Sequence, residues 1–119
     1  MPPRVWRVRV EDILEAIERV LSWTEGSSLD EFEEDDRTIQ AVAYNLLIIG
    51  EAASAIPESV QRRYPEIPWA KMRGMRNLLA HEYHDVDPAI VWQTVQSNLP
   101  QLVPALQGML DTDGDSESS

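Results

Sequence analysis

Apolar residues recur along this chain at steps of three and four, the spacing that places them on one face of a helix. The first series runs from residue 10 to 21 and the second from residue 39 to 56. The first comprises Val10, Ile13, Leu14, Ile17, Val20 and Leu21, and the second Ile39, Val42, Ala43, Leu46, Ile49, Gly50, Ala53 and Ile56. Because no useful stretch alternates between polar and apolar residues, the pattern predicts an all-α fold. We expect an antiparallel bundle of about four to five helices.

Glycine and proline residues divide the first half of the chain. The first helix should end at Gly26, after which Asp30 is expected to cap a short turn. Pro57 should end the second long helix, and a short helix is expected over residues 59–64. Glycine inside a helix costs about 1 kcal/mol relative to alanine. Gly50 therefore indicates that another helix packs closely there, either within the protomer or across a dimer seam.

Two further helices are expected in the second half of the chain. Pro68 suits the first turn of a helix over about 69–83. Asp87 should cap the last helix, and Pro100 inside it should kink or split it.

Length and composition favour one intracellular domain. A chain of 119 residues has the common size of a single domain. From Asp111 onward it contains only Asp, Gly, Ser, Glu and Thr, so we expect a helical domain over 1–110 and a disordered acidic tail over 111–119. No run of 18 apolar residues predicts a membrane span, and the absence of cysteine fits the cytoplasm. Neither a metal site nor a cofactor is expected.

Charge is distributed unevenly along the chain. The formal net charge of −11 argues against binding nucleic acid, because phosphate contacts dominate such affinity. However, half of the ten basic residues lie in one stretch that contains a single acidic residue, Glu66. These five are Arg62, Arg63, Lys71, Arg73 and Arg76. A solvated surface is the ordinary alternative for such a patch.

The end of this basic stretch combines a permanent cation with a titratable side chain, in the run RNLLAHEY over residues 76–83. Arg76 can hold a phosphate with a fork of donors, and His81 can transfer a proton near neutral pH. Since RNA carries its own 2′-hydroxyl nucleophile, these two groups could cleave it without a metal ion. Asn77 lies four residues before His81 and would support it. A surface cation and a structural histidine are the ordinary alternative.

The pattern Arg-Asn-x-x-x-His-x-Tyr resembles the signature of the HEPN superfamily, in its HepT-like branch. Other segments stand in the order that such proteins show, and the likeness covers residues 10–110. They read IIGEAA at 48–53, PEIPW at 65–69, MRGMRN at 72–77, VW at 91–92 and NLP at 98–100.

The resemblance implies an all-α homodimer or higher homo-oligomer with a cleft between protomers. Active members are metal-independent ribonucleases and usually act as toxins. The resemblance to them points to transfer RNA or messenger RNA as the substrate. Catalysis carries over to Arg76 and His81, with Asn77 as a supporting residue. We expect RNA to enter a groove between protomers that Lys71 and Arg73 line together with Arg76.

The resemblance also implies a partner, a small nucleotidyltransferase antitoxin. In this branch the partner can transfer AMP from ATP onto the motif tyrosine, which matches Tyr83 here. AMP groups beside Arg76 and His81 would exclude an RNA phosphate by charge and by volume.

Two positions depart from the family pattern, Glu82 and His84. Glu82 places an anion beside the predicted site, where it could raise the basicity of His81 or weaken RNA binding. Together with the acidic net charge it favours a rival hypothesis, a non-catalytic helical binding partner of a nucleotidyltransferase. A structural dimer without a partner is a third possibility. Growth arrest when the chain is expressed alone would distinguish the toxin.

Overall fold

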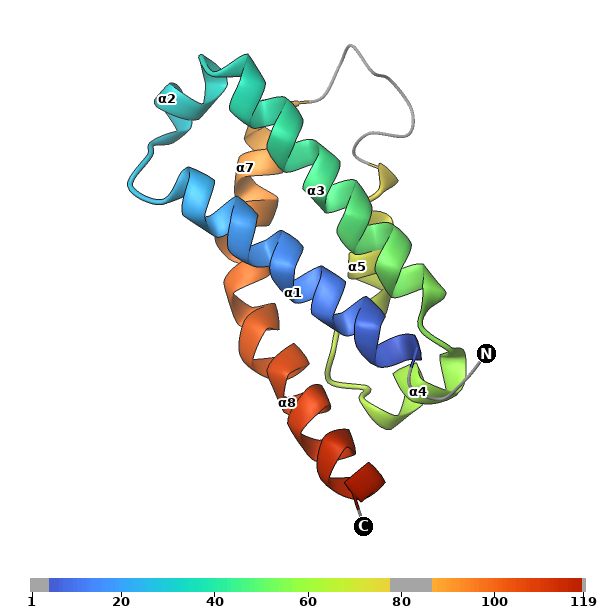
Figure 1. The fold of residues 1–119 in the computed structure, drawn as a ribbon. Helices are drawn as coiled ribbons and strands as arrows, with labels where there is room; N and C mark the ends of the chain where they lie inside the picture. Colours follow the sequence, from blue (N-terminus) through green and yellow to red (C-terminus); the bar gives the residue numbers. More distant parts are fainter. Residues whose placement is uncertain (1–4, 78–86, 119) are drawn as a thin grey trace.

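A computed structural model describes residues 5–77 and 87–118, with the side chains of the second range described as far as Thr112. All regular structure in these ranges is helical, which confirms the all-α prediction (Figure 1). The helices are α1 (Val5–Thr24), α2 (Leu29–Glu33), α3 (Asp36–Ala55), α4 (Glu58–Arg63), α5 (Trp69–Gly74), α7 (Pro88–Ser97) and α8 (Leu99–Ser118). None of these helices is long and apolar enough to cross a membrane.

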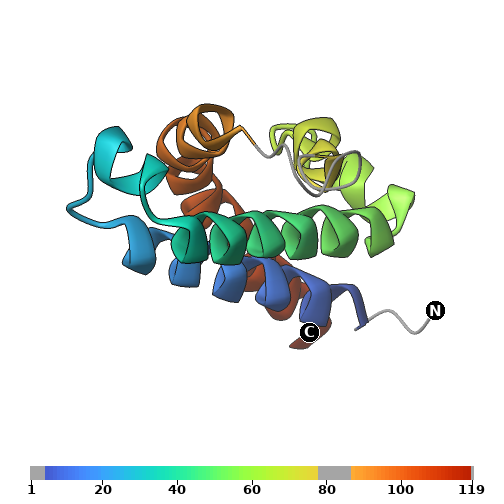
Figure 2. The same cartoon turned by 90° about the horizontal axis from the view of Figure 1, so that it is seen from above.

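Helix α3 occupies the middle of the bundle. Figure 2 shows α1 on one side of α3 and α5 and α7 on the other, with α8 running from the side of α7 to that of α1. The residue contacts agree, since α3 touches α1, α2, α5 and α7, while α8 packs against α1 and α7. The central position of α3 makes it the support on which α5 rests.

The two predicted apolar series form the buried faces of α1 and α3, and the second ends at Ile56, directly after α3. Every member of both series is buried except Leu21, which is partly buried. The last predicted helix is split, as expected, because α7 ends at Ser97 and α8 begins at Leu99. Pro100 therefore lies in the first turn of α8, where the missing N–H has no intrahelical partner to lose. Asp87 caps α7 as predicted, since its carboxylate accepts a hydrogen bond from the Ala89 N–H at 2.9 Å.

The predicted cap of the short second helix was wrong. Asp30 lies in the first turn of α2, and Ser28 is the capping residue. Ser28 Oγ accepts from the Glu31 N–H at 3.2 Å, and the Glu31 carboxylate accepts from the Ser28 N–H at 3.1 Å. This reciprocal pair satisfies two donors that a helix start leaves free, so α2 begins earlier than an Asp30 cap allows.

Helix α5 is shorter than predicted. It ends at Gly74, and a turn at Met75 and Arg76 follows in place of a continuous helix over 69–83. Glycine weakens the helix at that point, and the turn lets the chain pass close to α3. Residues 78–83 of the predicted helix lie outside the described residues.

Helix α8 continues beyond the predicted domain end. Its backbone stays helical to Ser118, whereas the sequence predicts disorder from Asp111. Met109 is its last buried side chain, and Asp111 and Thr112 are exposed. The segment after Leu110 thus extends a helix that the core already holds, and this segment itself contains no proline. A boundary of the packed domain at residue 110 remains a proposal.

Asp35 caps α3 and should give the fold a pH-dependent contribution to stability. Its carboxylate accepts hydrogen bonds from Thr38 Oγ1 at 2.7 Å and from the Thr38 N–H at 3.1 Å. These bonds, the side-chain one first, hold the pKa of Asp35 below its ordinary value of 3.8. Because the folded pKa is lowered, the contribution is present above the unfolded value and is lost as pH falls through the folded value.

We therefore expect Asp35→Ala to lower the melting temperature at neutral pH, and this difference to shrink as the pH falls below about 4. Thermal melts followed by circular dichroism at several pH values measure it. Glu34→Ala removes a neighbouring exposed carboxylate and serves as the matched control. A melting difference that stays the same at low pH would contradict the expectation.

Candidate functional site

The described part of the predicted motif lies where the turn after α5 meets α3. Arg76 and Asn77 follow α5 directly, and both are exposed. His81 and Tyr83 lie outside the described residues, so their roles remain predictions. The structure therefore describes the cationic part of the site.

Gly50 of α3 lets the turn after α5 approach the helix backbone. A Cβ atom at Gly50 would lie 2.7 Å from the Arg76 backbone nitrogen, 2.9 Å from Arg76 Cβ and 3.1 Å from the Arg73 carbonyl oxygen. Side chains larger than hydrogen do not fit at such distances unless the backbone moves. This confirms the packing reason expected for Gly50, and the contact lies within one protomer.

The guanidinium group of Arg76 reaches the same face of α3. Its Nη1 donates to Ser54 Oγ at 3.4 Å, a long and exposed hydrogen bond. Ser54 Oγ in turn donates to the Gly50 carbonyl oxygen at 2.9 Å, one helical turn back. Among the described residues Arg76 forms no ion pair, so most of its donors face solvent and can receive an anion.

Arg73 is held more firmly than Arg76. Its Nη1 donates to Gln61 Oε1 at 2.6 Å, and the side chain is partly buried. Gln61 Nε2 donates to the carbonyl oxygens of Ile56 at 3.0 Å and Ala53 at 3.4 Å, at the end of α3. Gln61 thus ties α4 and α5 to the C-terminus of α3, and Arg73 helps to fix the turn that carries Arg76.

The five basic residues of the predicted patch differ in their contacts and in their position relative to α5. Arg62 forms an exposed ion pair with Glu58 at 3.2 Å, and the Arg63 guanidinium lies 5.9 Å from the ring centroid of Trp6. Arg62 and Arg63 therefore make contacts with residues outside α5. The remaining three basic residues of the patch, Lys71, Arg73 and Arg76, lie on α5 or in the turn after it.

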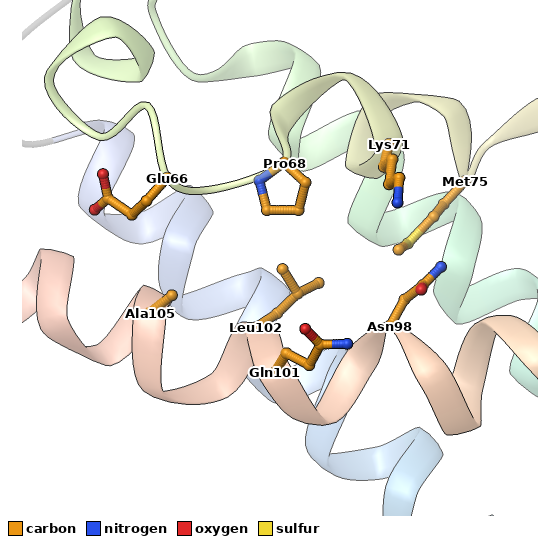
Figure 3. A pocket seen from close by; sticks show the side chains of 8 residues that line it. All are labelled: Glu66, Pro68, Lys71, Met75, Asn98, Gln101, Leu102 and Ala105. Carbon is orange, nitrogen blue, oxygen red and sulfur yellow. The ribbon is translucent and has the colours of Figure 1, made fainter.

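Lys71 faces a hollow between α5 and α8 (Figure 3). The hollow has a volume of about 150 Å³. Its lining residues are Glu66, Pro68, Lys71, Met75, Asn98, Gln101, Leu102 and Ala105. Lys71 of α5 and Met75, the residue directly after α5, both line it on this side.

Sequence reasoning missed three residues of this neighbourhood. Ser54 was not predicted as a site residue, although its hydroxyl accepts a hydrogen bond from Arg76. Gln61 was not singled out by the sequence, and Asn98 appeared only in the NLP run of the family resemblance, because nothing in the local sequence shows that they meet α5. Only the tertiary contacts of α3, α4 and α8 bring them there.

Comparison with known proteins gives the chain its family. Residues 13–109 match the family described as "Ribonuclease HepT-like". A protein of Thermococcus cleftensis named "Probable ribonuclease HepT" is 43% identical over 93 residues, which cover 78% of this chain and 84% of the relative. A protein of Methanocaldococcus jannaschii named "Putative RNase MJ0127" is 32% identical over 120 residues, which cover 100% of this chain and 99% of the relative. No solved structure matches the chain. The family match covers most of the chain, and this chain therefore belongs to the HepT-like ribonuclease family.

Proposed function

We propose that this HepT-like ribonuclease is a metal-independent endoribonuclease toxin that uses Arg76 and His81 for catalysis. The observation that carries the proposal is the setting of Arg76. Its backbone is fixed against Gly50, while its guanidinium is exposed and, within residues 5–77 and 87–112, bound only through one long hydrogen bond to Ser54. A cation that is anchored at its base and open at its tip is suited to receive a phosphate with two parallel hydrogen bonds.

The proposed chemistry uses the substrate's own nucleophile. The 2′-hydroxyl of RNA loses its proton and attacks the adjacent phosphorus, the bond to the 5′ oxygen breaks, and that oxygen gains a proton. The products are a 2′,3′-cyclic phosphate and a 5′-hydroxyl. His81 performs one proton transfer, and Arg76 stabilises the negative charge that builds up on the phosphorane, an effect of about 3 kcal/mol at comparable sites.

A homodimer would complete the site. Two copies of the motif across one cleft supply two histidines, one for each proton transfer. Lys71 and Arg73 would add positive charge along the RNA path beside Arg76. Transfer RNA or messenger RNA is the proposed substrate.

Regulation would act on Tyr83. A nucleotidyltransferase antitoxin that adds AMP to this tyrosine would place bulky anions near Arg76 and His81. Like-charge repulsion and lost space would then keep the RNA phosphate away.

The acidic net charge of −11 favours a second candidate, a non-catalytic partner that docks a nucleotidyltransferase. A chain of this charge repels RNA at long range, so its basic helix must act locally. The two candidates differ in whether the chain alone cuts RNA.

The test is RNA cleavage by the purified chain in excess EDTA, after its mass has shown that no AMP is attached. We expect the wild type to cut RNA and Arg76→Ala to cut it about 10² to 10³ times more slowly, because the variant loses the phosphate donors. Arg76→Lys keeps the positive charge but loses the forked donors, so its cleavage rate should lie between those of the wild type and Arg76→Ala. If wild-type protein of unmodified mass cuts neither transfer RNA nor messenger RNA, the docking partner becomes the better explanation.

A further inference from the structure

We propose that the hollow between α5 and α8 binds one unstacked pyrimidine base of the RNA. This inference rests on the proposed ribonuclease function and adds a base preference to it. Figure 3 shows the eight lining side chains around one space, with residues of α5 and of the segments next to it on one wall and residues of α8 and of the α7–α8 junction on the other.

The size of the hollow suits a single ring. Its volume is about 150 Å³, close to that of an enclosed apolar cavity that holds benzene, although this hollow opens to solvent beside the exposed Glu66, Lys71 and Gln101. Four side chains give it apolar walls on which a flat ring can lie: Pro68, Met75, Leu102 and Ala105. A six-membered pyrimidine fits such a space, whereas the two fused rings of a purine need more room.

The polar groups of the hollow suit the edge of a base. In the described part of the chain, neither Lys71 nor the Asn98 side chain has a hydrogen-bond or ion-pair partner. Figure 3 shows both at the Met75 end of the hollow, with Glu66 at the opposite end. Ammonium and amide N–H groups can donate to the carbonyl oxygens of a pyrimidine, whereas the Glu66 carboxylate points away from the other lining side chains in Figure 3.

Gln101 adds a hydrogen-bond acceptor to the hollow. Its Nε2 already donates to the Ser97 carbonyl oxygen, which fixes the amide in place. The Oε1 atom of Gln101 keeps its capacity to accept a hydrogen bond. The hollow therefore offers donors and acceptors on fixed helices, with apolar surface between them, which is the usual make-up of a specific small-ligand site.

The position of the hollow connects it to the phosphate-binding residues. Lys71 of α5 and Met75 in the turn after it line the hollow, and Arg76, the next residue, turns to α3 on the other side. A nucleotide likewise joins a flat polar ring to an anion. Proteins that read RNA sequence commonly bind the unstacked bases of single strands in pockets and hold the phosphates beside them. A base in the hollow would place its own strand across the end of α5.

Binding of the four nucleoside 5′-monophosphates is tested one at a time. The readout is the shift of the methyl NMR signals of Met75 and Ala105. We expect the uridine and cytidine compounds to shift these signals and the adenosine and guanosine compounds to bind roughly tenfold more weakly. Ala105→Leu fills the hollow and should weaken pyrimidine binding about tenfold. Gln107→Leu, an exposed position on α8 outside the lining, is the matched control and should bind like the wild type.

The second readout is the sequence at the cut sites of a random RNA pool. Wild type and Gln107→Leu should favour a pyrimidine on one side of the cut, and Ala105→Leu should lose this preference while it still cuts. Equal binding of purines and pyrimidines, or unchanged binding in Ala105→Leu, would overturn the inference. If the wild type cuts no RNA but binds pyrimidines in the hollow, the ribonuclease proposal fails and the pocket stands.

Discussion

His81→Ala should slow RNA cleavage by a factor of about 10² to 10⁴ and leave the fold intact. The reaction needs a group that takes up and releases a proton near neutral pH. Arg76 cannot do this, because an arginine keeps its charge at any pH the protein withstands. His81 is the motif residue whose ordinary pKa lies in the required range.

The chain offers a matched control, since its only other histidine is His84, three residues further on. His84→Ala removes the same ring from the same segment but leaves the motif whole, so it should cut RNA at nearly the wild-type rate. Single-turnover cleavage in excess EDTA gives the rates, and thermal melting checks the fold. The wild-type rate should also change with pH near the histidine pKa, and His81→Ala should lose that dependence.

Two outcomes would contradict the assignment. Full-rate cleavage by His81→Ala would remove the histidine from the mechanism. Equal losses in both variants would indicate that the segment needs its histidines for structure and that neither one is the specific proton donor. A loss confined to His81 would set the docking-partner hypothesis aside as well.

The long helices could be predicted from sequence because burial repeats with the helical period. Ile13 and Ile17 of α1, like Leu46 and Ile49 of α3, are completely buried at positions that the spacing alone identifies. The end of α5 could not be predicted in this way. Whether the chain leaves the helix at Gly74 depends on the contact of Arg76 with α3, which a local pattern does not contain.

The candidate site shows the same division. Arg76 could be identified because its motif is continuous in the sequence. Ser54 and Gln61 act on Arg76 and Arg73 from other helices, and the hollow beside Lys71 needs Asn98 from the junction of α7 and α8. Contacts of this kind arise only when distant segments pack, so they are findings of the structure.

The substitution with the largest expected effect on stability is Gly50→Ala. Inside a helix this change normally stabilises by up to about 1 kcal/mol. Here the new Cβ would meet backbone atoms, with the Arg76 nitrogen at 2.7 Å, so either α5 and its turn must move or the helix must distort. Overpacking of this kind costs about 1 to 3 kcal/mol, and we expect the net free energy of unfolding to fall.

Gly108→Ala provides the comparison. Gly108 also lies within a helix, α8, but a Cβ there meets nothing within 4 Å. The same chemical change should therefore leave the free energy of unfolding unchanged or raise it by up to about 1 kcal/mol. Urea unfolding of both variants measures the difference. A gain in stability in both variants would contradict the close packing of the turn after α5 against Gly50.

Cleavage by Gly50→Ala then tests whether this packing serves the site. Under conditions where the variant is fully folded, a displaced Arg76 should still reduce the rate. In an Arg76→Ala background the guanidinium is gone, so its position no longer matters and Gly50→Ala should add little further loss. Non-additive losses in this double-mutant cycle would tie the glycine to the phosphate-binding cation, whereas additive losses would mean that Gly50 supports the fold alone.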